Sequence, residues 1–332
     1  MTHVERFNAV MNFESVDRYP RIEWAGYWDK TVDRWHAEGL DPELNDRQAI
    51  RETLGLDPYS QFWIAPRGGD TPRPASHGAG ILTDEAQYDT ILHTLYQLPD
   101  FAADRFQSMA RENANGDRVV WISFDGFFWY PRTLFGIEGH LFAFYDQPKL
   151  MHRMNRDLLD YNLNLLDSFC EQVCVPQFMT IAEDMSYNHG PMLSKDLFDE
   201  FLAPYYKPLV SELKKRGIRV LVDSDGDVEP LIPWLKEVGV EGILPLERMA
   251  GVDVTKIRAD HPEWLMIGAY DKTVMKNGEE AMRTEFERLL PTIHTGGFIP
   301  SVDHQTPPDV SLENYRTYLK LLREYTSDQK TT

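Results

Sequence analysis

The pattern of hydrophobic and polar positions in the second half of the chain predicts a regular alternation of strands and helices. Short, continuous apolar runs are typical of strands that are buried on both faces of a parallel sheet. Runs with helical spacing follow them, and several end at a glycine, which commonly terminates a helix. The predicted strands are residues 178–181, 218–222, 242–246, 264–268 and 298–302, and the predicted helices are residues 194–216, 226–238, 254–259 and 279–295. This order implies parallel strands joined by right-handed crossovers.

The first half of the chain has a less regular pattern. Residues 19–24 and 119–124 are predicted strands, and residues 151–174 are a predicted long helix. The segment 61–96 contains strand-like pieces between Gly- and Pro-rich turns, at 61–64 and 80–82, and we interpret it as an inserted hairpin near one end of the fold.

Together the two halves give seven strands and an undetermined eighth, in one domain over residues 1–326 followed by a polar tail, 327–332. The predicted fold is an α/β (β/α)8 TIM-type barrel with an insertion in its amino-terminal half.

Composition excludes several classes of protein. The net charge of −19 argues against a nucleic-acid partner, because binding a phosphate backbone requires a basic face. No apolar run is long enough to span a membrane and no signal peptide is visible, so no membrane association is expected. Cys170 and Cys174 are the only cysteines, which indicates a reducing, cytoplasmic compartment. We expect both thiols to be structural.

Acidic residues recur at the carboxyl ends of the predicted strands, which meet at one rim of a parallel barrel. One such residue commonly caps the next helix, but recurrence after most strands favours a site for a metal, a cation or acid–base chemistry. Two of them, Asp223 and Asp225, are two positions apart and should face the same side. The series comprises Glu23, Asp125, Glu183, Asp184, Asp223, Asp225, Glu247, Asp271 and Asp303, with His304 next to the last.

Aromatic residues follow the same strand ends. Phe128 and Trp129 come directly after the strand at 119–124, and either core packing or a pocket wall explains them, the latter with Arg132 facing an anionic group. No dinucleotide fingerprint, P-loop or HExxH motif occurs, and the ligands that would complete an EF-hand after Asp225 are absent.

In several segments the sequence resembles the uroporphyrinogen decarboxylase superfamily. The resemblance covers essentially the whole chain and implies a (β/α)8 barrel, a homodimer and a site at the carboxyl rim. The segments that carry it are Glu5-Arg6-Phe7, Val16 to Pro20, Glu183-Asp184-Met185, Pro191 to Ser194, Phe201 to Tyr206, Asp223 to Asp227, and Gly296 through His304 to Val310.

The superfamily implies two chemistries. Its decarboxylases bind a polyanionic tetrapyrrole through an Arg-Gln-Ala-Gly-Arg segment, where this chain has Arg-Ile-Glu-Trp-Ala-Gly-Tyr at residues 21–27. Only one arginine remains, and eight substrate carboxylates would be repelled by the acidic rim, so we disfavour porphyrinogen decarboxylation.

The other branch contains methyltransferases that act with a corrinoid protein and hold zinc through a His-x-Cys pair and a later cysteine. Asp223-Ser224-Asp225 and the region of Asp303 and His304 occupy these positions, so both cysteines are replaced. An oxygen-rich site with one histidine could hold Zn²⁺, Mn²⁺ or Mg²⁺, or no metal. No Asp-x-His-x-x-Gly corrinoid signature occurs, so a corrinoid would be carried by a separate protein.

Our leading hypothesis is the transfer of a methyl group from a small O- or N-methylated substrate to a corrinoid protein. The alternatives are decarboxylation or another lyase reaction on a small acid held by Arg132, and a non-catalytic ligand-binding protein. We expect Asp225 and His304 to meet in one site, with His304 rather than Asp303 pointing inward. The candidate catalytic residues are Asp225, His304, Glu183 and Asp184, the candidate metal ligands are Asp223, Asp225 and His304, and the candidate substrate-binding residues are Trp24, Trp28, Trp63, Phe128, Trp129, Arg132, Tyr187 and Glu247.

Overall fold

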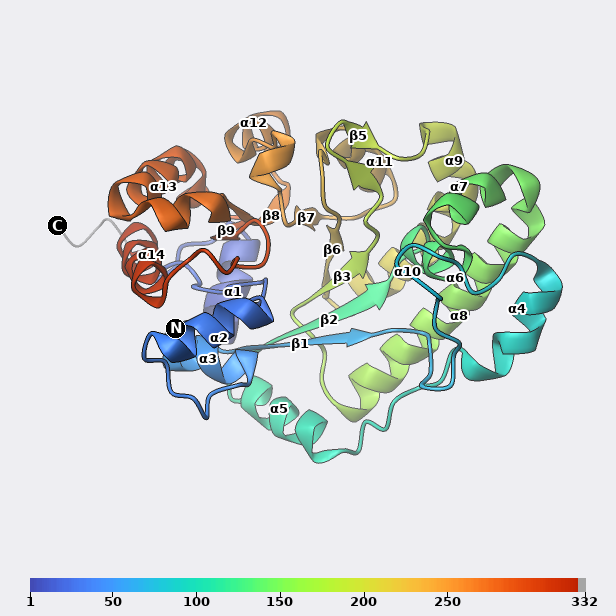
Figure 1. Ribbon diagram of the computed structural model, residues 1–332, viewed down its shortest axis with the longest axis horizontal. Helices are drawn as coiled ribbons and strands as arrows, with labels where there is room; N and C mark the ends of the chain where they lie inside the picture. The colour runs from blue at the N-terminus through green and yellow to red at the C-terminus, as the bar shows by residue number, and fades with distance from the viewer. Residues whose placement is uncertain (328–332) are drawn as a thin grey trace.

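A computed structural model describes residues 1–327 of the chain. Within this range, seven parallel strands form one sheet whose order follows the sequence, and the sheet curls while helices cover its outer face (Figure 1). The strands are β1 (Tyr59–Ile64), β2 (Val119–Asp125), β3 (Phe178–Ala182), β6 (Arg219–Asp223), β7 (Gly242–Leu244), β8 (Leu265–Tyr270) and β9 (Phe298–Val302), and β4 (Ser186–Tyr187) and β5 (Gly190–Pro191) form a separate antiparallel pair.

Helices occupy most connections between the strands, as expected for parallel pairing. The helices are α1 (His3–Met11), α2 (Asp29–Ala37), α3 (Arg47–Thr53), α4 (Glu85–Ile91), α5 (Asp104–Ala114), α6 (Trp129–Phe135), α7 (Ile137–Asp146), α8 (Pro148–Gln172), α9 (Lys195–Phe201), α10 (Ala203–Lys215), α11 (Ile232–Glu237), α12 (Val254–Asp260), α13 (Glu279–Ile293) and α14 (Leu312–Tyr325). None of the helices in residues 1–327 is both long and apolar enough to cross a membrane.

The strands predicted from residue 119 onward are confirmed to within a few residues. Ser194 caps α9 by accepting a hydrogen bond from the Leu197 N–H, as its position suggested. The predicted helix 194–216 is divided at Leu202 into α9 and α10, and the segment 226–238 becomes helical only from Glu229.

Two predictions about the first half are wrong. Residues 61–64 belong to β1, which pairs in parallel with β2, and are not part of an inserted hairpin. Residues 80–82 form no strand, because this segment bonds instead to the carbonyl of Leu134 at the end of α6. The segment after β1 is instead a long loop that contains α4 and a short 3-10 turn at Leu92–Thr94.

Residues 19–24, predicted to be a strand, form no strand ladder either, but they occupy the eighth position. Pro20 has no N–H to donate, and the N–H of Trp24 donates to the Ser301 side chain and not to a backbone carbonyl. On the other side, the carbonyl of Arg21 accepts from the Asp57 N–H, and the carbonyl of Glu23 accepts from the Tyr59 hydroxyl. Hydrogen bonds therefore connect this extended segment to β9 and to the β1 side, although it is not a regular strand.

The interior of the barrel is closed by one layer of apolar side chains at its amino-terminal end. Every strand of the curled sheet contributes to this layer, Ile22 contributes from the eighth position, and α1 covers it from below. Its members are Phe7, Val10, Met11, Ile22, Tyr59, Val119, Trp121, Phe178, Leu221, Leu244, Leu265, Ile267 and Ile299. A second and larger core fills the space between the sheet and the outer helices.

Along each strand the inward-facing positions become polar toward the carboxyl end. Because side chains alternate between faces, Asp223 lies on the same inner face as Leu221, two residues earlier. In β2 the same face carries Trp121, then Ser123, then Asp125. The Ser123 hydroxyl lies 2.8 Å from the Thr180 hydroxyl of β3, which gives a buried polar layer between the apolar floor and the rim. The fold therefore directs acidic side chains to one end of the barrel.

The predicted polar tail begins where the described residues end. The backbone of Ser327 forms an antiparallel bridge with Arg18, and its hydroxyl donates to the carbonyl of Arg323, so this residue is attached to the body of the protein. Residues 328–332 of the predicted tail lie outside the described part of the chain.

Candidate functional site

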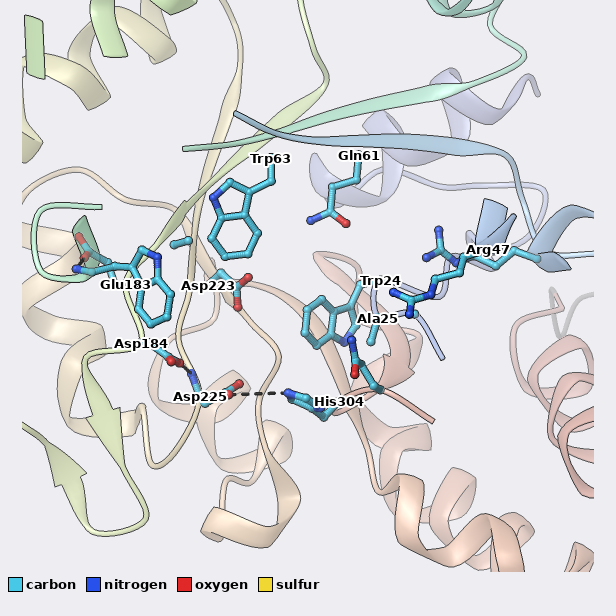
Figure 2. A pocket seen from close by; sticks show the side chains of 15 residues that line it. Trp24, Ala25, Arg47, Gln61, Trp63, Glu183, Asp184, Asp223, Asp225 and His304 are labelled. Carbon is cyan, nitrogen blue, oxygen red and sulfur yellow. Dashed lines mark hydrogen bonds and ion pairs between the residues drawn. The ribbon is translucent and has the colours of Figure 1, made fainter. Parts of the chain in front are cut away.

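A cavity of about 410 Å³ opens at the carboxyl ends of the strands. Figure 2 shows its side chains converging from strand ends on several sides of the barrel. The cavity is lined by Trp24, Ala25, Gly26, Arg47, Arg51, Gln61, Trp63, Trp129, Ala182, Glu183, Asp184, Asp223, Asp225, His304 and Gln305. Three of the four candidate catalytic residues have a side chain exposed to this space, and the fourth, Glu183, contributes to its wall.

Asp225 and His304 lie together, although 79 positions separate them in the sequence. The His304 Nε2 atom is 3.8 Å from the Asp225 Oδ2 atom (Figure 2). Burial, followed by the charges of Glu247 and Asp184, raises the pKa of Asp225 to about 7. Burial and the charge of Lys272 lower the pKa of His304. At neutral pH the site therefore contains a carboxyl group that is partly protonated, next to a neutral imidazole.

Asp223 points into the cavity from the end of β6 (Figure 2). Burial raises the pKa of Asp223 well above its usual range, and the charges of Asp225 and Asp184 add to that rise. No donor in residues 1–327 is hydrogen-bonded to its carboxylate, so this side chain is free to interact with a ligand. Asp223 and Asp225 thus share one cavity, as their spacing predicted.

Asp184 lies at the turn after β3 in a left-handed backbone conformation with φ of 48°. Such conformations cost energy in residues other than glycine and are concentrated at functional sites. Its carbonyl accepts a hydrogen bond of 3.0 Å from Arg132, and its Oδ1 atom accepts one of 3.5 Å from the Asp225 N–H. The strained turn therefore places the Asp184 carboxylate next to Asp225.

Glu183 has a carboxylate whose bonding capacity is used within the protein. Its two oxygens accept the N–H groups of Phe127, Phe128 and Trp129 at 2.7 to 3.0 Å and the Tyr206 hydroxyl at 2.5 Å. Burial raises the pKa of Glu183 to about 7, and these four hydrogen bonds oppose the rise. This arrangement favours a positioning role, holding the turn before α6, over the acid–base role predicted from the sequence.

Asp303 and Glu247 are also bonded to the protein. The Asp303 carboxylate is fully buried and accepts from the Arg248 N–H and from Lys272, whose Nζ atom lies 3.1 Å away. It is therefore His304, and not Asp303, that lines the cavity, as predicted. Glu247 lies outside the lining residues, and its Oε2 atom accepts the Gly226 N–H at 3.0 Å. Its effect on the site is electrostatic, through the pKa of Asp225.

The aromatic residues divide into two groups. Trp24, Trp63 and Trp129 line the cavity, and their indole groups supply its apolar surface. The Trp63 Nε1 atom donates to Asp125 at 2.6 Å, which fixes its ring. The predicted contacts of the other three aromatic residues are not found. Phe128 is fully buried against His140 and Phe144, whereas Trp28 and Tyr187 are exposed outside the cavity.

The arginines that line the cavity are not the arginine predicted from the sequence, Arg132. Arg132 bonds to the Asp184 carbonyl and lies over the Trp129 ring, 5.4 Å from its centroid, and it is not among the lining residues. Arg47 and Arg51 line the cavity instead, from α3. Sequence reasoning missed both, although their spacing of four residues places them on one face of a helix. Gln61 and Gln305 also line the cavity and were not predicted to do so, because no feature of the sequence distinguishes them from other glutamines.

The candidate metal ligands do not form a metal centre as they are arranged here. In residues 1–327, no group of three His, Cys, Asp or Glu side chains is placed as metal ligands would be. Asp225 and His304 are close, but Asp223 does not complete a three-ligand set with them. In this arrangement these side chains make no metal centre, so the metal stays a prediction, and we assign it no step in the chemistry.

The two cysteines lie away from the cavity. Cys170 is half-buried near the end of α8, and Cys174 lies just past that end and not within the helix as predicted. Burial raises the pKa of Cys170 to about 11 and that of Cys174 to about 12. Thiols with such pKa values are poor nucleophiles at neutral pH, which agrees with a structural role.

Comparison with solved structures identifies relatives of the fold. A methyltransferase from Methanosarcina mazei superposes with a TM-score of 0.68 at 15% identity, covering 98% of this chain and 99% of that chain. A B12-independent methionine synthase from Shewanella sp. W3-18-1 (TM-score 0.40, 12% identity, covering 69% and 66%) and a Bacillus subtilis mannanase (0.49, 11%, covering 94% and 88%) are more distant. At these identities the likeness concerns the fold alone. No curated protein sequence matches the chain significantly.

A match to a family model assigns the chain to a protein family, which similarity of fold alone cannot do. The model described as uroporphyrinogen decarboxylase (URO-D) matches residues 134–325, which is more than half of the chain. This region includes β3 and β6 to β9, and with them Asp184, Asp223, Asp225 and His304. The chain belongs to the uroporphyrinogen decarboxylase family.

Proposed function

We propose that this protein is a methyltransferase that moves a methyl group from a small O- or N-methylated substrate to a corrinoid carried by a separate protein. The observation that carries the proposal is the Asp225 and His304 pair, 3.8 Å apart in a cavity walled by three tryptophans. Family membership and a fold shared with a methyltransferase support it. The corrinoid would supply the methyl acceptor, and the residues described here would bind the donor and control its protonation.

The side chains of the cavity can meet the chemical requirement of demethylation. A methyl group leaves readily only if the atom it leaves can accept the bonding electrons, so an ether oxygen must be protonated as the bond breaks. Asp225, with a pKa of about 7, is partly protonated at neutral pH and can donate that proton. His304 is uncharged under the same conditions and can orient the donor or return the proton from solvent.

The proposal is tested by supplying the protein with free reduced cobalamin and a panel of methoxylated and N-methylated compounds. We expect methylcobalamin and the demethylated product to appear in equal amounts with at least one donor. Removal of a general acid typically costs 10²- to 10⁴-fold, so Asp225→Asn should lower kcat by about 10²-fold or more for an O-methylated donor. Asp70→Asn, on an exposed loop, is the matched control and should leave the rate unchanged.

Decarboxylation of a small acid is the second candidate, and Arg47 and Arg51 favour it because they offer a carboxylate-binding surface in the cavity. Release of CO2 without transfer of a methyl group would establish this activity and overturn the first proposal. Binding without turnover of any donor or acid would indicate a ligand-binding protein. The homodimer implied by the family remains a prediction, to be tested by sedimentation.

A further inference from the structure

We infer that the cavity binds a small zwitterion with a methylated, positively charged nitrogen at one end and a carboxylate at the other. That this molecule binds is argued from the cavity alone. That it is the methyl donor rests on the proposed function. Charges of opposite sign line the two ends of one cavity. Figure 2 shows Asp223 and Asp225 on one side, Arg47 on the opposite side, and Trp24 between them.

Arg51 is the residue that indicates an anionic group in the ligand. Its Nε atom is buried without a hydrogen-bond partner, and no ion pair in residues 1–327 includes its guanidinium group. The guanidinium carbon lies 4.8 Å from the centroid of the Tyr59 ring. Arginine does not lose its charge in proteins, and a partly buried cation without a counterion is unfavourable. A ligand carboxylate would provide the missing partner.

The neighbours of Arg51 do not supply this counterion. Glu23 lies close enough to interact with it, but burial raises the pKa of Glu23 and favours the uncharged form. Arg47 pairs with Asp29 at 2.8 Å, and the Asp29 side chain is 91% exposed. Exposed pairs of this kind contribute little, so Arg47 can turn toward a ligand without a large loss. Both arginines are therefore available at the same end of the cavity.

The opposite end is suited to a cation. Burial, and then the charges of the neighbouring acids, oppose ionisation of Asp223 and Asp225 there, and a bound positive charge would favour their ionised forms. Trp24 lies between the two ends (Figure 2), and Trp63 and Trp129 also line the cavity. The faces of indole rings attract cations, and a methylated ammonium group, with its charge spread over the methyl groups, is the cation that aromatic walls bind well.

A neutral methoxylated ring would leave part of this arrangement unused. A methoxybenzoate could satisfy the arginines and contact the tryptophans, but it would bring no positive charge to Asp223 and Asp225, whereas Asp184 already has Arg132 4.0 Å away. A methylated ammonium group carries its charge to that end and also contains the methyl group to be transferred. The charge distribution therefore favours an N-methylated donor over an O-methylated one.

The transfer from such a donor balances without an added acid. The bond between the methyl carbon and the nitrogen breaks, its electron pair stays on the nitrogen, and the nitrogen becomes a neutral amine. The methyl carbon forms its new bond with the nucleophilic electron pair of the reduced corrinoid, the acceptor named by the proposed function. The carboxylates would attract the nitrogen while it is positively charged. They would bind the neutral amine product less strongly, so the product could leave the cavity.

The binding test uses ω-trimethylammonio carboxylates with one to four methylene groups between the charges. The series is needed to find which distance between the two charged groups fits the cavity. Each is compared with its isostere, in which a quaternary carbon replaces the nitrogen and removes the positive charge. Titration calorimetry on the full chain, without corrinoid, should show at least one member binding at least tenfold tighter than its isostere. Equal or tighter binding of every isostere, or binding of neither series, would overturn the inference.

Variants separate the two ends of the cavity. Arg51→Gln should weaken binding of the best zwitterion at least tenfold and leave binding of tetramethylammonium, which lacks the carboxylate, unchanged. Asp223→Asn should weaken both. Arg47→Gln gives a second test of the same end, and Arg111→Gln, on the exposed face of α5, is the matched control. Unchanged zwitterion affinity in folded Arg51→Gln and Arg47→Gln would contradict the assignment of the carboxylate end.

The outcome is distinguishable from failure of the proposed function. If the zwitterion binds as described but no methyl group reaches reduced cobalamin, the binding inference stands and methyl transfer is wrong. If methyl transfer occurs from an O-methylated donor and no zwitterion binds, the proposed function stands and the inference that the cavity binds a zwitterion is wrong.

Discussion

At the scale of single residues, the protonation of Asp225 depends on its burial and on several charged neighbours. Acidic and basic groups face it from several elements, and burial adds to their effect. The groups that interact with it are Asp184, Asp223, Glu247, Asp303, Lys272 and His304. Because burial, and then the charges of Glu247 and Asp184, raise its pKa, the folded protein holds a proton on Asp225 over a range of pH in which the unfolded chain does not.

The resulting prediction concerns stability as a function of pH. The pKa of Asp225 is about 7 in the folded protein and 3.8 in an unfolded chain, so its stabilising contribution is fully present below pH 3.8 and is lost as the pH rises to about 7. Asp225→Asn should therefore be more stable than the natural protein at pH 8, by about 1–2 kcal/mol after solvent screening of a side chain that is 38% exposed.

Urea unfolding between pH 4 and pH 8 measures this difference. The two proteins should converge at pH 4, and the control variant Asp70→Asn should follow the natural protein throughout. A constant difference between Asp225→Asn and the natural protein over the whole pH range would contradict the raised pKa.

The sequence predicted which acidic residues gather at the rim, but not which of them are free to bind a ligand. Asp223, Asp225 and His304 line the cavity because they follow inward-facing strand positions. Glu183 and Asp303 follow strands in the same way, yet backbone N–H groups or Lys272 use their oxygens. Such partners lie far away in the sequence, so spacing alone cannot identify them.

At the scale of elements, Glu183 connects the end of β3 to the turn before α6. The two elements approach closely here, since a methyl group added at Gly126 would lie 2.1 Å from the Glu183 carboxyl carbon. The N–H groups of residues 127–129 all point at the Glu183 carboxylate. They lie at the amino-terminal end of α6, where backbone N–H groups have no acceptor within the helix. The turn also carries Trp129, so Glu183 holds one wall of the cavity in place.

Glu183→Gln should therefore destabilise the protein, by about 2–4 kcal/mol, because the amide NH₂ would face N–H groups that need an acceptor. Tyr206→Phe removes only one of the four hydrogen bonds and should cost about 1 kcal/mol. Unfolding in urea measures both changes. If Glu183→Gln keeps full stability and loses only turnover, Glu183 is an acid–base residue as the sequence suggested, and the positioning role is wrong.

The elements of the second half were predictable because parallel strands buried on both faces give continuous apolar runs. The elements around the eighth position were not. β1 gives no continuous apolar run, because it contains polar Ser60 and the cavity-lining Gln61, so it resembled part of an insertion. Residues 19–24 are extended, but the Trp24 N–H donates to the Ser301 side chain and the Val302 N–H donates to the Glu23 side chain, and no local pattern encodes that choice.

At the scale of the whole molecule, the distribution of charge limits the substrate. The net charge is −19, and the rim that faces a substrate is acidic apart from the arginines of α3. We therefore predict that the protein does not decarboxylate uroporphyrinogen, whose eight carboxylates such a rim would repel, although the chain belongs to the family named for that reaction. Anaerobic incubation with uroporphyrinogen and analysis of the products test this, and coproporphyrinogen formed at an enzymatic rate would show it to be wrong.

Closure of the barrel depends on Glu23, which lies in the eighth position and is fully buried. Its Oε1 atom accepts the Val302 N–H at 2.8 Å and the Ser301 hydroxyl, while its Oε2 atom has no well-formed hydrogen bond within residues 1–327, although the Tyr318 hydroxyl lies near enough to lower the pKa of the acid. An ionised carboxylate with a bare buried oxygen is unfavourable, and burial accordingly raises the pKa of Glu23. We conclude that Glu23 closes the barrel as an uncharged acid.

A pair of variants tests this conclusion. Glutamine has the shape of a protonated glutamate and keeps an acceptor for β9, so Glu23→Gln should change the free energy of unfolding by less than about 1 kcal/mol. Glu23→Ala leaves the Val302 N–H and the Ser301 hydroxyl without an acceptor and opens a cavity, so it should cost about 2–4 kcal/mol. Equal losses in both variants would mean that Glu23 is ionised. Its charge would then balance Arg51, and the argument that Arg51 lacks a counterion would fail with it.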